Sequence, residues 1–384
     1  MANPKLKFVA LYFGNPQSGI NKKVISQVQG LRDSNIDAEL IFLGNKGADE
    51  VFEQDFIKFL PTKTPPYKSF FDKLQAVRSL RMSYEKLFFE GDDKEVIYLR
   101  GYLPAFWFYK AVKKTRKKVI LELPSNPFGE ALSRKSYIYY LSLCLYHKPI
   151  LKNLDLLIGT TTDLLYTNFN PEKYKVAKMV IGNGVNVNAM PLRKRETDLS
   201  GPEFNFTCVA ELSPPHGIDR ILRGLSEYKG KDIINLHIVG KGALLGSLKQ
   251  LTEELKLKNV TFHGFLSGDK LNEIFEETDL ALAPLAIHRS DVTTNSSIKA
   301  REYSARGIPF AISGMDEEFP EGTSFVYHIE SNETSVDVEA FIDFMKKVIK
   351  MPGYKEEMRE YAVQNLSWDI KMKKLAEFIK TQLL

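Results

Sequence analysis

Short apolar runs alternate with segments of helical periodicity along most of the chain. Residues 8–13 are almost continuously apolar, which is typical of a strand buried on both faces. The next segment, 21–32, repeats apolar side chains at helical spacing, with Val24, Val28 and Leu31 on one face. Strands that alternate with helices predict parallel sheets with helices on both faces.

The same alternation continues through both halves of the chain. In the first half it predicts strands at 38–43, 96–99, 119–121, 156–158 and 178–181 and helices at 105–114 and 137–154. In the second half it predicts strands at 206–210, 236–239, 260–262, 280–284 and 308–312 and helices after Gly217 and at 244–255, 270–275 and 297–306. A proline-containing, charged stretch separates the halves. We therefore expect two Rossmann-like, doubly wound α/β domains that face each other across a cleft, residues 1–185 and 204–365, joined by a linker at 186–203.

Composition narrows the class of protein. With 384 residues, a net charge of +5 and no apolar run near the ~18 residues of a membrane span, we expect a cytoplasmic protein, or one peripheral on the inner face of a membrane. Cys144 and Cys208 lack zinc spacing. The basic run 113–118 is either a solvated helix end or, with the aromatic and basic segment 134–152, a docking patch for anionic lipid. No aromatic and basic platform suggests nucleic acid.

Ligands of parallel α/β sheets bind where strands end, and two such junctions carry glycines. At 14–19, Gly19 permits close approach before a helix whose amides would suit an anion, although a plain turn fits equally. At 213–217, we expect Ser213 to cap the next helix, and Gly217 again permits close approach. His216 at this junction is either a ligand contact or structural.

Two further junctions point to a diphosphate. Gly240 and Lys241 follow a strand, which is a weak signal. The segment 287–303 is stronger. In it, Ser296 is expected to cap a helix, Ser297 adds a free amide, and the cations that complete an anion site are Arg289 and Lys299. Glu302 would accept hydrogen bonds from ribose hydroxyls, or would simply pair with Lys299 on the surface.

Several motifs are absent from the sequence. No Asp-x-Asp pair occurs, so we expect no metal ion and no other cofactor. The P-loop, the Gly-x-Ser-x-Gly nucleophile turn and the Gly-x-Gly-x-x-Gly dinucleotide fingerprint are also missing.

In order along the chain, these junctions resemble the retaining GT-B glycosyltransferases (family 4-like). More narrowly, they are similar to bacterial enzymes that build capsular or extracellular polysaccharide. The resemblance rests on segments 122–128 (similar to "EIPTYPY"), 181–186, 209–222, 236–242, 260–265, 280–284, 288–310 and the Ser-Trp pair at 367–368.

The resemblance implies transfer of a sugar from an NDP-sugar, most simply a UDP- or GDP-sugar, with retention of configuration and without metal. The acceptor would be a glycan or a lipid-linked molecule, and an anionic membrane surface is a further partner. It implies catalytic roles for His216, Arg289 and Lys299. Donor contacts would come from Gly19, Gly217, Gly240, Lys241, Phe265, Ser296, Ser297 and Glu302, and acceptor contacts from Ser125, Asn126 and Glu130. Residues 366–384 would form a helix that crosses back to the first domain.

Two positions depart from the family pattern. Thr294 stands where the wider family has the first of two glutamates, and Glu211 stands where its phosphate loop has an arginine. These departures leave two alternatives open, a catalytically silent GT-B partner protein and a nucleotide-sugar epimerase.

Overall fold

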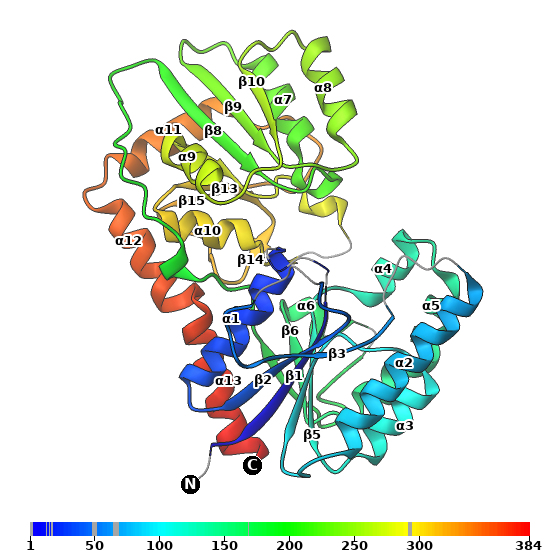
Figure 1. The fold of residues 1–384 in the computed structure, drawn as a ribbon. Helices are drawn as coiled ribbons and strands as arrows, with labels where there is room; N and C mark the ends of the chain where they lie inside the picture. Colours follow the sequence, from blue (N-terminus) through cyan, green and yellow to red (C-terminus); the bar gives the residue numbers. More distant parts are fainter. Residues whose placement is uncertain are drawn as a thin grey trace. The chain divides into compact units, whose positions relative to one another are not determined.

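The computed structural model describes residues 3–12, 14, 16, 18–47, 52–63, 69–167, 169–290 and 294–384. The chain forms two compact units (Figure 1). The first unit is Met1–Gly182 together with Trp368–Leu384, and the second is Asn183–Ser367. Each unit is built on a parallel sheet, so the predicted pair of Rossmann-like sheets is confirmed.

The first unit contains a seven-stranded parallel sheet in the order β3-β2-β1-β4-β5-β6-β7. Its strands are β1 (Lys5–Leu11), β2 (Asp37–Leu43), β3 (Ile57–Leu60), β4 (Val96–Arg100), β5 (Lys118–Leu123), β6 (Leu156–Gly159) and β7 (Ala177–Val180). The central strands are buried on both faces, as their continuous apolar sequences predict.

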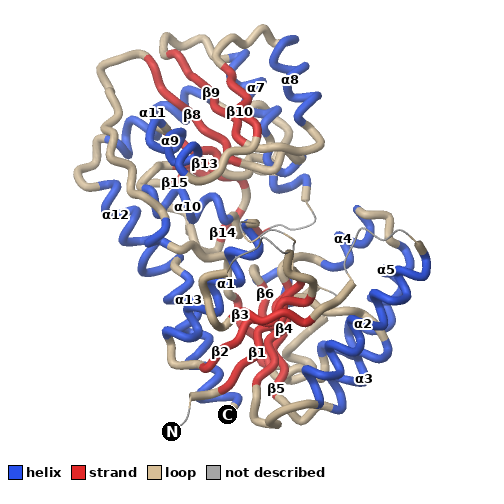
Figure 2. Tube along the Cα trace, viewed as in Figure 1, coloured by secondary structure: helices blue, strands red, loops and turns tan. Residues whose placement is uncertain are grey.

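Helices cover both faces of this sheet (Figure 2). They are α1 (Gly19–Asp33), α2 (Phe70–Phe89), α3 (Phe106–Lys114), α4 (Pro127–Ser133), α5 (Tyr137–Leu151), α6 (Thr162–Leu165) and α13 (Trp368–Phe378), which continues into η5 (Ile379–Leu383). Val28 of α1 and Met372 of α13 share one core, and Phe108 of α3 and Leu143 of α5 belong to the other. No helix within the described ranges is long and apolar enough to cross a bilayer.

The second unit contains a six-stranded parallel sheet in the order β10-β9-β8-β11-β13-β15. Its strands are β8 (Glu203–Val209), β9 (Ile233–Val239), β10 (Val260–Gly264), β11 (Leu280–Leu282), β13 (Phe310–Ser313) and β15 (Val326–Ile329), with a separate pair β12 (Thr294–Asn295) and β14 (Met315–Asp316). Its helices are α7 (Ile218–Glu227), α8 (Leu245–Glu254), α9 (Asp269–Glu277), α10 (Ile298–Arg306), α11 (Val338–Ile349) and α12 (Tyr354–Tyr361).

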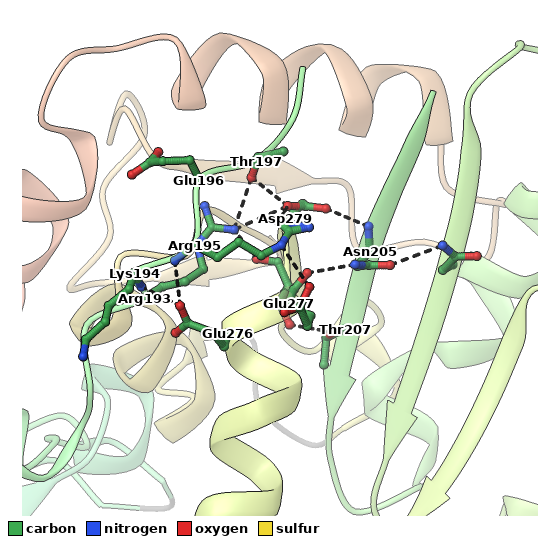
Figure 3. Close-up of polar contacts among 12 residues, drawn as sticks. Arg193, Lys194, Arg195, Glu196, Thr197, Asn205, Thr207, Glu276, Glu277 and Asp279 are labelled. Carbon is green, nitrogen blue, oxygen red and sulfur yellow. Dashed lines mark hydrogen bonds and ion pairs between the residues drawn. The ribbon is translucent and has the colours of Figure 1, made fainter. Parts of the chain in front are cut away.

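The segment that precedes β8 is fixed to the second unit by a buried carboxylate (Figure 3). Asp279 is fully buried, and its Oδ1 lies 2.8 Å from Nη1 of Arg195 and 3.4 Å from Nη1 of Arg193. The hydroxyl of Thr197 donates to the same oxygen at 2.6 Å. A buried carboxylate is stable only when it is paired and hydrogen-bonded, so this network holds 193–197 in one conformation.

Candidate functional site

The six-stranded sheet has its topological switch point between β8 and β11. The chain continues from β8 to β9 on one side, whereas β11 lies on the other side of β8. Ligands of open α/β sheets bind outside the carboxyl ends of the strands at such a point. The loops that leave these two strands, 210–217 and 283–290, are joined, because the Leu285 amide donates to the His216 carbonyl at 3.1 Å.

Two predicted glycines make this close packing of loops possible. Gly217 has φ +61°, and a Cβ there would lie 2.9 Å from the carbonyl carbon of Leu285. Gly240 has φ +141°, and a Cβ there would lie 1.8 Å from the carbonyl oxygen of Ala210. Both glycines therefore bring protein loops together at the carboxyl edge of the sheet. Lys241 is exposed beside Gly240.

His216 lies in the first of these loops and is largely buried. Its Nδ1 is 3.0 Å from the hydroxyl of Ser213, and burial lowers the pKa of the imidazole. Ser213 lies at the N-cap of the next helical element, as expected, but this element is a single 3-10 turn (Pro214–His216) and the hydroxyl makes no capping bond. Gly217 is the N-cap of α7. The turn begins with two prolines, which have no amide hydrogen to donate to a capping hydroxyl.

Arg289 lies in the second loop, and its charge is balanced by two carboxylates. Its guanidinium binds Asp219 with two bonds of 2.6 and 2.9 Å, and its Nε donates to Glu333 at 2.9 Å. The hydrogen bonds that Arg289 donates to these carboxylates, first to Glu333, raise its pKa. The structure thus shows Arg289 tying its loop to the first turn of α7.

The amino end of α10 is anchored by a residue that is distant in sequence. The N-cap of α10 is Ser297, not Ser296 as the sequence suggested, and it makes no side-chain capping bond. The Ser296 hydroxyl is already engaged, because it accepts a hydrogen bond from the Asn183 amide at 2.7 Å. The Asn183 side chain also donates to the Ser296 carbonyl at 2.6 Å. Sequence reasoning did not identify this contact.

Lys299 and Glu302 form an ion pair on α10. Nζ of Lys299 lies 2.9 Å from Oε2 of Glu302, which is the pairing that the sequence left open. The two side chains are 32% and 16% exposed. A partly exposed pair of this kind contributes little stability, so both groups are available to a ligand at small cost.

Arg301, within the segment 287–303, is a buried hub to which the sequence analysis gave no role. Its Nη2 lies 2.7 Å from Oδ1 of Asp316, and its Nε donates to Glu318 at 3.2 Å and to the Asn183 carbonyl at 3.1 Å. Burial opposes the charge, but the two carboxylates outweigh it and raise the pKa of Arg301.

The remaining donor-side residues are less constrained. Phe265 follows β10 at the carboxyl edge and is 67% exposed. Thr294 is buried in β12, and Glu211 is exposed. Thr293, which the predicted motif included, lies outside the described residues.

On the first unit, the three predicted acceptor-side residues contact one another or cap a helix. Asn126 is the N-cap of α4. Its side-chain oxygen accepts hydrogen bonds from the amides of Phe128 and Gly129 at 3.1 and 3.3 Å. The Ser125 hydroxyl donates to Glu130, which lies 3.6 Å from Arg134. The loop is therefore well ordered at the carboxyl end of β5.

Gly19 is the first residue of α1, at the carboxyl edge of the first sheet. The Ser18 side chain caps this helix by accepting from the Asn21 amide at 3.2 Å. No described atom lies within 4 Å of a Cβ built on Gly19, so the position is open to a ligand. Residues 13, 15 and 17 of the preceding loop lie outside the described ranges.

A buried polar cluster joins α1 to the end of β5, and sequence reasoning missed it. Glu122 near the end of β5 accepts hydrogen bonds from Lys23 at 2.9 Å, Tyr98 at 2.6 Å and Gln27 at 3.1 Å, and lies 3.7 Å from Arg100. Burial favours the neutral acid, but the nearby cations and hydrogen bonds hold the pKa of Glu122 to about 2. The cluster fixes α1 to the end of the sheet. Within the described part of the chain, no group of three or more His, Cys, Asp or Glu side chains is arranged to hold a metal ion.

Comparison with known proteins identifies the second unit. The family model described as "Glycosyl transferases group 1" matches residues 203–351, which include both switch-point loops and α10. An uncharacterized glycosyltransferase of Methanocaldococcus jannaschii is 24% identical over 215 residues, which are 53% of this chain and 51% of that protein. The chain thus spans about half the length of this curated relative.

Solved structures resemble the chain over its whole length. A glycosyltransferase from Rickettsia africae has a TM-score of 0.66 at 16% identity and covers 100% of this chain and 99% of its own. Sucrose-phosphate synthase from Thermosynechococcus elongatus has a TM-score of 0.71 at 13% identity, with 99% of both chains covered. Anabaena HepE in complex with UDP and glucose has a TM-score of 0.65 at 15% identity, covering 99% of this chain and 100% of its own. At these identities the likeness concerns the fold.

Proposed function

We propose that this chain, which has the GT-B fold and whose second unit belongs to the glycosyl transferases group 1 family, is a retaining glycosyltransferase that uses an NDP-sugar without a metal ion. The observation that carries the proposal is the partly exposed Lys299–Glu302 pair at the start of α10, inside the matched region. A UDP- or GDP-sugar is the proposed donor. The complex of Anabaena HepE with UDP and glucose supports a uridine nucleotide.

In the proposed reaction, the bond between the sugar C1 and the leaving phosphate oxygen breaks while the acceptor oxygen bonds to C1 on the same face. The acceptor proton passes to the leaving phosphate. The free amides at the start of α10, including that of Ser297, and the cation of Lys299 stabilise the developing negative charge. Glu302 accepts hydrogen bonds from the ribose hydroxyls. Phe265 contacts the base, and His216 contacts the sugar.

Arg289 is assigned a positioning role in this proposal. Because two carboxylates balance its charge, it holds the 283–290 loop in place and does not act as a free cation. Gly217, Gly240 and Lys241 shape the same edge of the site.

The acceptor is proposed to bind the first unit near Gly19 and the loop of Ser125, Asn126 and Glu130. It would be a glycan or a lipid-linked molecule of polysaccharide or glycoconjugate biosynthesis, used on the cytoplasmic side. If the acceptor is lipid-linked, the enzyme acts at an anionic membrane surface.

The test is binding of UDP-, GDP-, ADP- and dTDP-sugars by calorimetry in EDTA, with wild type, Glu302→Ala and Lys299→Ala. We expect one nucleotide class to bind, and Glu302→Ala to weaken it about 10- to 100-fold, because hydrogen bonds to a charged group contribute about 1.5–3 kcal/mol. Glu85→Ala, which breaks a comparable helix ion pair with Arg81, is the matched control and should bind like wild type.

Two outcomes contradict the proposal. If no nucleotide binds at millimolar concentration, the silent partner protein, which Thr294 and Glu211 already suggested, replaces the transferase. If a donor binds and NMR of the product shows an inverted anomeric centre, the retaining mechanism is wrong.

A further inference from the structure

Large exposed apolar side chains gather on one part of the first unit. We call the following six, each more than half exposed, the apolar rim: Phe71, Leu74, Phe106, Leu132, Ile138 and Leu141. They come from α2, α3, α4 and α5. Contiguous apolar surface of this kind on a folded protein indicates an interaction site.

The topology places the apolar rim at the carboxyl edge of the sheet. The helices α2, α3 and α5 each connect two parallel strands, so they run opposite to the strands and begin at that edge. The rim residues of these helices lie in their first two turns, and α4 follows the end of β5 directly. The helix α3 packs against both α2 and α5, and α4 packs against α5 (Figure 1). The rim is therefore one surface beside the loop of Ser125 and Glu130.

The helix α5 shows most clearly that this surface needs a partner. Leu143 and Ile150 are buried against the sheet, whereas Ile138, Leu141 and Leu145, spaced i, i+3 and i+7, are 83%, 63% and 64% exposed. A helix that is apolar all round is normally buried on all sides. The outer face of α5 is thus suited to an apolar medium.

The charges beside the rim identify the partner. The sequences of α3 and α5 contain lysines and no acidic residue. The helices α2 and α4 place two acidic residues at the rim, Asp72 and Glu130, which pair with Lys63 and Arg134. Lys110 lies 4.5 Å from the ring centroid of Phe106, and Arg134 and Lys135 separate Leu132 from the start of α5. With Lys73, Lys110 and Lys135 the cations of this face outnumber its carboxylates, so two copies of the face would bring like charges together. An anionic bilayer takes up the apolar side chains and attracts the cations at once.

The basic run at 113–118 does not form this surface. Lys117 is buried and bonded to Glu95 at 2.8 Å, and Lys118 lies 2.9 Å from Asp155. These residues adjoin the carboxyl end of α3, whereas the rim is at its amino end. Of the two segments in the predicted docking patch, 134–152 contributes to the rim, whereas Lys117 and Lys118 of 113–118 are already paired.

We propose that the apolar rim docks into the interface of an anionic lipid bilayer. Docking in this orientation brings the loop of Ser125, Asn126 and Glu130 to the headgroup level. The acceptor is then a lipid-linked molecule whose reacting end is presented at that level; this last part rests on the proposed function, whereas the docking does not.

The experiment is sedimentation of the full chain with vesicles of phosphatidylcholine alone or with about 30% phosphatidylglycerol. We expect binding to the anionic vesicles, weakened by 0.5 M salt, and at least about ten-fold weaker binding by Ile138→Glu/Leu141→Glu. The matched control, Ile233→Glu/Val363→Glu, changes two exposed apolar residues of the second unit and should bind like wild type. Unchanged tryptophan fluorescence of Ile138→Glu/Leu141→Glu and unchanged far-UV circular dichroism of the control establish that the variants are folded.

The following results would overturn the docking proposal. If wild type does not bind, or if both double variants bind equally well, the rim is not a lipid surface. If wild type is a dimer by analytical ultracentrifugation and Ile138→Glu/Leu141→Glu is a monomer, a second copy covers the face instead. Vesicle binding without any nucleotide binding would support the docking and refute the proposed transferase. Nucleotide binding without vesicle binding would refute the docking and leave the proposed transferase standing.

Discussion

His147 of α5 makes the stability of the first unit dependent on pH. The side chain is 1% exposed, with Nε2 at 3.1 Å from the Thr167 carbonyl and Nδ1 facing the Tyr102 hydroxyl. Because a carbonyl only accepts hydrogen bonds, Nε2 carries the hydrogen and Nδ1 accepts from Tyr102. Burial lowers the pKa of His147 to about 4; the Thr167 carbonyl opposes this shift and Lys148 adds to it.

The direction and size of the effect follow from linkage. In the unfolded chain His147 binds a proton below its ordinary pKa of about 6.5, whereas the folded unit resists protonation until about pH 4. The contribution of the neutral His147 to the free energy of unfolding is complete above pH 6.5 and is lost as the pH falls from 6.5 to 4. Between pH 8 and pH 5, the free energy of unfolding should therefore fall by about 2 kcal/mol on account of this residue.

The chain offers a selective probe for this measurement. Its only two tryptophans, Trp107 and Trp368, both belong to the first unit. Urea unfolding followed by tryptophan fluorescence at pH 8 and pH 5 therefore reports this unit. The control is His147→Gln, whose amide offers one acceptor and one donor at similar positions and does not titrate. Other titrating groups are common to both proteins and cancel in the difference.

We expect wild type to lose about 2 kcal/mol more than His147→Gln between the two pH values. Equal losses in the two proteins would refute the reasoning, because they would mean that the folded unit accepts the proton as readily as the unfolded chain.

Three further predictions concern the second unit. The first two are tested by urea unfolding monitored by far-UV circular dichroism, and the third by trypsin cleavage. Arg301→Met leaves two carboxylates without their cation and should cost about 3–5 kcal/mol; a loss below about 1 kcal/mol contradicts the hub. Gly240→Ala forces a Cβ against the Ala210 carbonyl and should cost more than about 2 kcal/mol, whereas Gly246→Ala, in open space on α8, should gain up to about 1 kcal/mol. Asp279→Asn removes the counter-charge of the segment before β8, so trypsin should cut there at least several-fold faster; an unchanged cleavage rate would show that the buried carboxylate does not hold the segment.

The sheets were predictable because strands buried on both faces have continuous apolar sequences, as in β1 and β5. The helix α2 was missed for the opposite reason. Its outer face carries Phe71, Leu74 and Val77, all exposed, so it lacks the contrast between apolar and polar faces that indicates a helix. The exposed apolar side chains that weakened the helical pattern of α2 include Phe71 and Leu74 of the apolar rim.

The candidate site was predictable in residue type and in position along the strands, but not in pairing. The partners of Arg289, namely Asp219 and Glu333, lie 70 and 44 residues away, and the partner of Ser296 lies 113 residues away. Local patterns such as a serine before a helix cannot reveal that a distant amide already occupies the hydroxyl. The Glu122 cluster was missed likewise, since Lys23 is 99 residues away.

The magnitudes of the two cation–carboxylate contacts decide which cation a diphosphate would use. The Lys299–Glu302 pair spans three residues on one helix and is worth only about 0.2–0.5 kcal/mol, so a donor separates it at little cost. Separation would free Lys299 for a phosphate and Glu302 for a ribose at the same time. Arg289, by contrast, is held by a two-bonded contact to Asp219 and by Glu333, and its release would leave carboxylates facing the incoming anion. We therefore propose Lys299 as the cation that moves to the phosphate and Arg289 as the one that stays in place.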